Sequence, residues 1–189
     1  MRSILPQEKN PVLRKVSEPV VLDDISRLKI KELLREMKEL LAKEEFGVAL
    51  AAPQVGEPIR LFIVSGKALA RDARNALDEE REDDEEEFVE KPEPTPLPDQ
   101  VYINPELTKL SRGRKGKHEG CLSIRGKWGV VPRAEKATIR AYDEEGRAFT
   151  RGASGFLAHV FQHEMDHLEG ILYIDKAKEL YDDKPDEKE

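Results

Sequence analysis

Hydrophobic residues between positions 24 and 45 recur at helical spacing, which predicts an amphipathic helix near the N-terminus. The apolar face of this predicted helix consists of Ile25, Leu28, Leu33, Met37, Leu40 and Leu41. Asp23 or Asp24 is expected to cap its first turn, and Gly47 should lie beyond its end.

A second helix is predicted to begin after Ser154, a good N-cap residue, and to end before Gly170. Short strands are expected between the two helices, separated by glycine, proline or charged turns, at residues 60–64, 101–103, 129–131 and 137–142. The sequence DEEG at 143–146 predicts a hairpin turn. The predicted fold class is α+β, with short, mostly antiparallel strands packed around the second helix.

The overall composition fits one compact domain over residues 1–189, because the chain has 189 residues of which 38% are hydrophobic. No stretch of about 18 consecutive apolar residues is present, and the N-terminus lacks the apolar core of a secretory signal. We therefore expect a cytoplasmic protein without a membrane partner. The single cysteine excludes an internal disulfide, so it is a packing residue, a reactive thiol or a metal ligand.

The net charge of −7 is concentrated in one segment. Residues 78–90 contain ten acidic residues and one arginine, and the proline-rich sequence KPEPTPLP follows. Like charges and prolines oppose packing, so residues 70–99 are interpreted as a mobile insertion, either without function or as an interaction segment. The acidic end of the chain, residues 182–189, is expected to fray.

The predicted second helix contains an HExxH motif, formed by His163, Glu164 and His167. Histidines four residues apart project from one face of a helix and can bind one metal ion, while the glutamate beside the first ligand can act as general base. The motif also arises by chance on exposed helices. Here the flanking residues are too apolar for an exposed helix, and buried histidines and carboxylates are costly unless they are paired or bind a metal.

A catalytic site of this kind needs a third protein ligand, for which the chain offers two candidates. Glu187 lies twenty residues after His167, as in thermolysin-like proteases, but its charged terminal surroundings make a rigid position difficult. Cys121 is the alternative, although a lone cysteine is more often a small buried hydrophobic residue than a ligand. The residue types alone leave this choice open.

Three sequence strings, GVALAAPQVG at 47–56, EGCLS at 119–123 and QHEMDHLEG at 162–170, resemble the signature motifs of the peptide deformylase family, in the family's order. The resemblance covers most of residues 1–175. It implies hydrolytic removal of the formyl group from the formylmethionine of nascent polypeptides, in the cytoplasm, with the ribosome as a candidate partner and no role for DNA. It also implies a metal bound by Cys121, His163 and His167, usually Fe2+, with Ni2+, Co2+ or Zn2+ as substitutes.

The resemblance further implies roles for several other residues. Glu164 would move the protons, while the side-chain amide of Gln54 and the backbone N–H of Leu122 would stabilise the oxyanion. Substrate would contact Val48, Ala49, Gly120, Trp128, Phe156, His159 and Val160.

Three of these positions depart from the family pattern. Ala49 stands where glycine is usual, and Trp128 stands where many bacterial members have arginine. His159 is a polar residue in an otherwise apolar methionine pocket, and we interpret it as hydrogen-bonded or rim-facing.

Two rival functions follow from the same residues. The first is an HExxH endopeptidase that uses Glu187 as its third ligand. The second is a non-catalytic binding module with a structural metal or none. The intact ligands, glutamate and glutamine favour the deformylase over the binding module.

Overall fold

The computed structural model describes residues 2–79 and 97–182. Its α-helices are α1 (Leu28–Lys43), α2 (Gly66–Glu79), α3 (Gly155–Leu168) and α4 (Tyr173–Lys176). Its strands are β1 (Ala49–Ala51), β2 (Leu61–Val64), β3 (Gln100–Leu110), β4 (Arg114–Cys121), β5 (Ile124–Ala134), β6 (Lys136–Tyr142), β7 (Ala148–Ser154) and β8 (Glu179–Asp182). Short 3-10 helices cover Gln7–Lys9, Pro11–Arg14, Leu22–Asp24 and Ala52–Val55.

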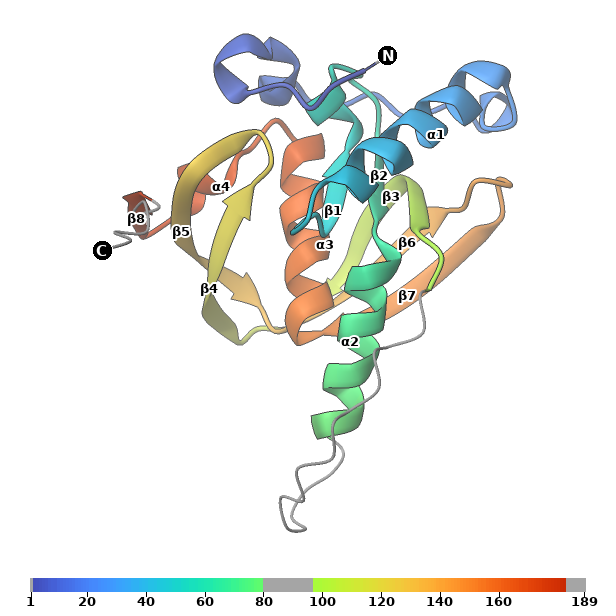
Figure 1. Ribbon diagram of the computed structural model, residues 1–189. Coiled ribbons are helices and arrows are strands. Elements are labelled where there is room, and N and C mark those ends of the chain that lie inside the picture. Colours follow the sequence, from blue (N-terminus) through green and yellow to red (C-terminus); the bar gives the residue numbers. More distant parts are fainter. Residues whose placement is uncertain (1, 80–96, 183–189) are drawn as a thin grey trace.

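The strands form two antiparallel sheets, with α3 between them (Figure 1). One sheet has the order β1-β2-β3-β6-β7, and the other has the order β4-β5-β8. The predicted α+β class with antiparallel strands around the HExxH helix is confirmed. None of the described helices is long and apolar enough to cross a membrane.

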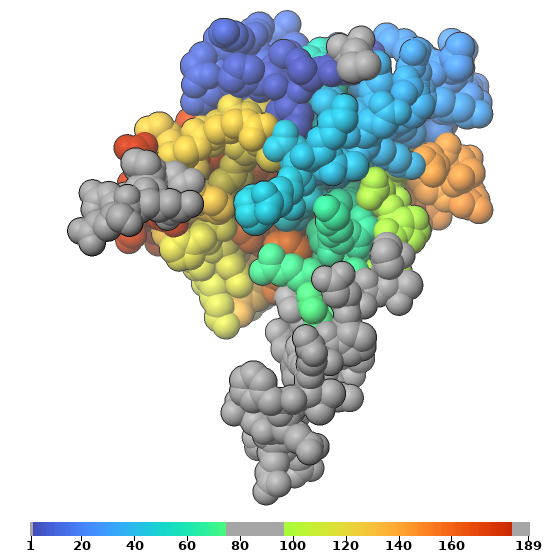
Figure 2. Space-filling model, in the orientation of Figure 1, coloured from blue at the N-terminus to red at the C-terminus, as the bar shows by residue number. Residues whose placement is uncertain are grey.

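The five-stranded sheet is covered on both faces at β2, which explains why its sequence LFIV is continuously apolar and buried. Phe62 and Val64 of β2 share a core with α3, whereas Leu61 and Ile63 share a core with α1. Because successive strand residues point to opposite faces, one short strand contributes to both cores. Helix α3 is therefore largely enclosed, and in the space-filling view it is visible only between α1, α2 and β4 (Figure 2).

The helix starts differ in detail from those predicted. Helix α1 begins at Leu28 after a 3-10 turn, and its N-cap is Arg27, so the predicted cap by Asp23 or Asp24 is wrong. Asp24 forms an ion pair with Arg27 instead. Ser154 is the N-cap of α3 but makes no side-chain capping bond; the N–H of Leu157 donates to the carboxylate of Asp72 in α2.

The predicted acidic insertion is partly corrected by the structure. Residues 70–79 continue helix α2 and are not a loop, whereas residues 97–99 lead into β3 without regular secondary structure, as predicted. The backbone N–H of Gly66 donates to Asp99, which fixes the start of α2. Residues 80–96 lie outside the described part of the chain, and their mobility stays a prediction. At the C-terminus, Asp182 belongs to β8, contrary to expectation, while Glu187 lies outside the described residues.

Candidate active site

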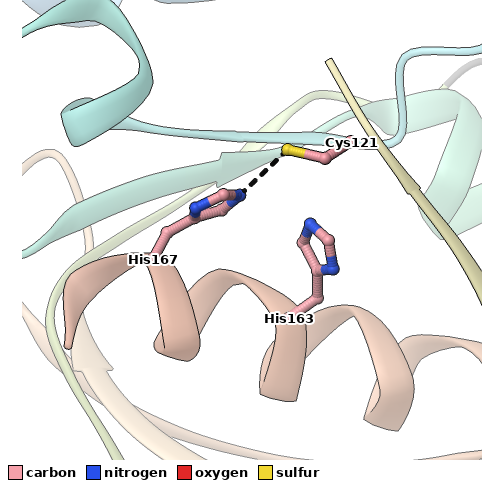
Figure 3. A group of neighbouring side chains, drawn as sticks. All are labelled: Cys121, His163 and His167. Carbon is pink, nitrogen blue, oxygen red and sulfur yellow. Dashed lines mark hydrogen bonds between the residues drawn. The ribbon is translucent and has the colours of Figure 1, made fainter. Parts of the chain in front are cut away.

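Three of the predicted ligands converge beside α3. His163 and His167 project from one side of the helix toward Cys121, the last residue of β4 (Figure 3). One ligand atom from each residue lies within 4.8 Å of the others. The Cys121 Sγ atom is 3.3 Å from Nε2 of His167. The structure thus brings Cys121 together with two histidines that lie 42 and 46 positions later in the sequence.

The donor set fits a divalent metal ion. Sulfur and nitrogen ligands of a tetrahedral ion at about 2.3 and 2.0–2.1 Å lie roughly 3.5 Å apart, close to the separation of Cys121 Sγ and His167 Nε2. His163 donates through Nδ1 to Glu119 at 2.7 Å, which leaves Nε2 available as a ligand atom. Three protein ligands leave a further position for water or substrate, as in catalytic sites.

The electrostatics around Cys121 favour its metal-binding form. Burial opposes ionisation of the thiol, but the charges and hydrogen bonds of His167 and His163 outweigh it and lower the pKa of Cys121 to about 5. A thiolate, and not a thiol, is the species that binds metals. The side chain of Cys121 can therefore act as a ligand at neutral pH.

Glu164 lies next to His163 in a buried environment. Among the described residues, its Oε2 atom has no hydrogen-bond partner, and the same is true of Nδ1 of His167. Burial raises the pKa of Glu164, although the two histidines oppose the shift. A raised carboxyl pKa suits a group that takes up and returns a proton near neutral pH.

Gln54 also points toward the metal ligands. Its Oε1 atom accepts a hydrogen bond from the backbone N–H of Ala51 at 2.8 Å, which assigns the Nε2 amide as the donor on the opposite side. That Nε2 atom lies 3.5 Å from both Cys121 Sγ and Ser123 Oγ. Leu122 follows Cys121 directly, in the turn between β4 and β5. The two predicted oxyanion donors therefore flank the cysteine.

The predicted substrate residues fall into two groups. Val48, Ala49, Phe156 and Val160 belong to one apolar cluster beside α3. The guanidinium of Arg71, in α2, lies 4.6 Å from the centre of the Phe156 ring. Gly120 and Trp128 lie together on the β4–β5 sheet, where a Cβ at Gly120 would be 3.2 Å from the indole, and Trp128 is 40% exposed.

The sequence analysis missed a buried ionic network behind the ligands. Glu119 accepts hydrogen bonds from Nε and a terminal nitrogen of Arg133, at 2.6 and 3.0 Å, as well as from His163. Arg133 also pairs with Asp166, which in turn contacts Lys176. Burial would raise the pKa of Glu119, but hydrogen bonds from His159, His163 and Arg133 outweigh it and hold the pKa well below its usual range. The sequence signal that could have indicated this network was the glutamate directly before Gly120 and Cys121.

His159 belongs to this network. Its Nε2 atom lies 2.9 Å from Oε1 of Glu119, so the predicted hydrogen-bonded histidine is found with a carboxylate partner.

An α+β fold with an HExxH helix and a nearby Cys/His/His set defines a metal-dependent hydrolase. Comparisons with known proteins narrow this class. The sequence model of the family described as polypeptide deformylase matches residues 1–183. The chain belongs to this family.

Relatives and solved structures agree with this assignment. A peptide deformylase of Leptospira biflexa is 38% identical over 169 residues, covering 89% of this chain and 84% of the relative. A Met-Ala-Ser-bound peptide deformylase of Acinetobacter baumannii has a TM-score of 0.72 and 26% identity, with coverage of 93% of this chain and 98% of that one. The enzyme of Thermotoga maritima gives a TM-score of 0.70 at 27% identity, with coverage of 95% and 99%.

The family assignment establishes the reaction: the chain is a hydrolase that removes the formyl group from the N-terminal methionine of nascent polypeptides. The endopeptidase and binding-module readings are not favoured.

Proposed function

We propose that deformylation takes place where Cys121, His163 and His167 converge, with Glu164 as the proton-transferring residue. The observation that carries this proposal is the convergence of the three ligand atoms within 4.8 Å, beside a buried glutamate. Sγ of Cys121 and Nε2 of both histidines would hold the metal. We propose Fe2+ as the native ion, with Ni2+, Co2+ or Zn2+ as substitutes, because imidazole and thiolate ligands suit these ions.

When bound, a divalent ion polarises a carbonyl oxygen and lowers the pKa of a coordinated water toward about 7. The protein groups perform the remaining steps. The Gln54 amide and the Leu122 N–H donate to the formyl oxygen as negative charge develops there, a contribution of about 3–4 kcal/mol per donor in comparable acyl chemistry. Glu164 takes a proton from the attacking water and returns it to the departing nitrogen, so water and the formamide become a free amine and formic acid, which ionises to formate.

The apolar cluster near α3 provides a site for the methionine side chain. Phe156 and Val160 lie seven and three residues before His163, so they share its face of the helix. Val48 and Ala49 line the same cluster from β1 and the residue preceding it. The methyl group of Ala49 narrows the space relative to glycine. Formylmethionine would thereby place its formyl group near the ligands.

We further propose that the enzyme acts in the cytoplasm, close to the ribosome. The substrate is a nascent chain, and the basic residues Arg112, Arg114 and Lys117 lie in or beside the exposed strand β4. Such positive charge could attract ribosomal RNA through its phosphates.

A direct test is formate release from a formyl-Met peptide, measured with and without a metal chelator. Chelator-sensitive formate release supports the proposal, and readdition of Fe2+ or Co2+ should restore it. Internal cleavage of casein without formate release would instead support the endopeptidase. Absence of both activities in metal-loaded, folded protein would support a binding module.

Trp128→Ala should weaken long substrates more than short ones. The indole lies against Gly120, one residue from Cys121, where residues after the methionine would pass. Loss of one partly exposed aromatic contact of about 1 kcal/mol corresponds to roughly a fivefold increase in KM for a formyl-Met tetrapeptide. KM for formyl-Met-Ala should hardly change.

Leu180→Ala is the matched control for Trp128→Ala. Leu180 is also an exposed apolar residue of this sheet, but its side chain lies on the opposite face from Trp128, beside Gly129. This substitution should leave KM for both peptides unchanged. An equal change in KM for the short and long peptides in Trp128→Ala would show that Trp128 does not recognise the residues after the methionine.

A further inference from the structure

His159 lies one helical turn before His163 and shares a carboxylate with it. Nε2 of His159 is 2.9 Å from Oε1 of Glu119, while Nδ1 of His163 is 2.7 Å from Oε2 of the same residue. The Glu119 side chain is only 1% exposed. The two histidines therefore meet at opposite oxygens of one buried carboxylate.

Glu119 is fully engaged by its partners. Oε1 accepts from Arg133 Nε and His159, and Oε2 accepts from another nitrogen of Arg133 and from His163. An ionised carboxylate has about four acceptor sites, so these four bonds saturate it and fix its plane. A fixed plane holds the imidazole of His163 in one orientation and one tautomer, as carboxylate partners do for metal-bound histidines.

His159 contributes a hydrogen-bond donor to this arrangement and adds no charge that the network requires. The carboxylates of Glu119 and Asp166 are already matched by the cations of Arg133 and Lys176. Because Glu119 is an acceptor only, Nε2 of His159 must carry the hydrogen. Without this donor, Oε1 would keep one partner in a buried setting and the carboxylate would be freer to turn.

We propose that His159 is a positioning residue, which orients the metal ligand His163 through Glu119. This inference rests on the proposed ligand set and extends it. It also assigns His159 a different role from the neighbouring Phe156 and Val160, because its polar end is directed to the network behind the ligands. Replacement of His159 should therefore weaken metal binding more than it weakens binding of the methionine side chain.

The test compares His159→Leu with His159→Gln. Leucine fills similar space without a donor, whereas the glutamine amide can place an N–H near the original Nε2 position. Affinity for Co2+ would be measured by competition with a chelator, together with the visible absorption spectrum of the cobalt-loaded protein. His159→Leu should weaken Co2+ binding about tenfold and change the spectrum, the low end for loss of such an outer partner. His159→Gln should stay within about twofold of the unaltered protein.

Phe156→Leu is a matched control on the same face of α3, where the phenyl ring contacts Arg71. It should alter KM for formyl-Met-Ala but leave Co2+ affinity unchanged, the reverse of the pattern expected for His159→Leu. If the leucine variant does not fold, His159→Met replaces it, since methionine adapts to irregular spaces without supplying an N–H donor.

Normal Co2+ affinity and spectrum in the folded leucine or methionine variant would overturn the proposal. Equal losses in His159→Gln and His159→Leu would also overturn it, because the donor would then not be the relevant feature. Failure of the ligand set itself is distinguishable, since Cys121→Ala would then retain Co2+ whatever residue occupies position 159.

Discussion

Cys121→Ala should give a folded protein that retains no stoichiometric metal and releases no formate. The thiol is one of three candidate ligand atoms within 4.8 Å, and alanine would leave only the two imidazoles of α3. Its lowered pKa also means that the variant loses a negatively charged ligand. Metal content would be measured by atomic absorption after gel filtration, and formate release would be assayed on the same sample.

Two controls make this prediction specific. Glu187→Ala should change neither metal content nor turnover. This result would identify Cys121, and not Glu187, as the third ligand. His118→Ala removes an exposed histidine of β4 that contacts Tyr181, and it should also retain the metal. One metal ion per chain in purified Cys121→Ala would contradict the proposed ligand set.

The sequence predicted those elements whose hydrophobic pattern reflects their burial. Helix α1 was evident because Leu33, Met37 and Leu41 recur at helical spacing and are all buried. Strand β2 was evident because LFIV is apolar throughout, as required of a strand covered on both faces. In α3, apolar residues surrounding the HExxH motif already indicated that its histidines do not lie on an exposed helix.

Strand β4 could not be predicted from its own residues. Half of the residues in its sequence, RKGKHEGC, are charged and half are exposed, and it contains two glycines, which disfavour strands. Antiparallel pairing with β5 stabilises this strand, although its own residues have a low strand propensity. Helix α2 was missed for a related reason: its sequence runs into a long acidic stretch, which led the whole segment to be interpreted as a loop.

The sequence identified the metal ligands but not the ionic network that supports them. Cys121 was identified through the EGCLS motif, because a motif consists of residues that are neighbours in the chain and can be recognised from the sequence. The contacts of Glu119 with Arg133, His159 and His163 join β4, β5 and α3, and only the packing of these elements creates them. Local pattern contains no information about such long-range pairing.

Glu164→Gln should separate proton transfer from metal binding, in contrast to Cys121→Ala. Glu164 is not among the three converging ligands, so the variant should retain one metal per chain. Glutamine keeps the size of the side chain but cannot take up the proton of the attacking water. We expect kcat to fall at least about 100-fold, the lower range for loss of general acid–base catalysis, with little change in KM. Parallel measurements of metal content and initial rates of formate release test both expectations. Loss of the metal would instead assign Glu164 to the metal ligands or their support, and near-normal turnover would mean that another group transfers the proton.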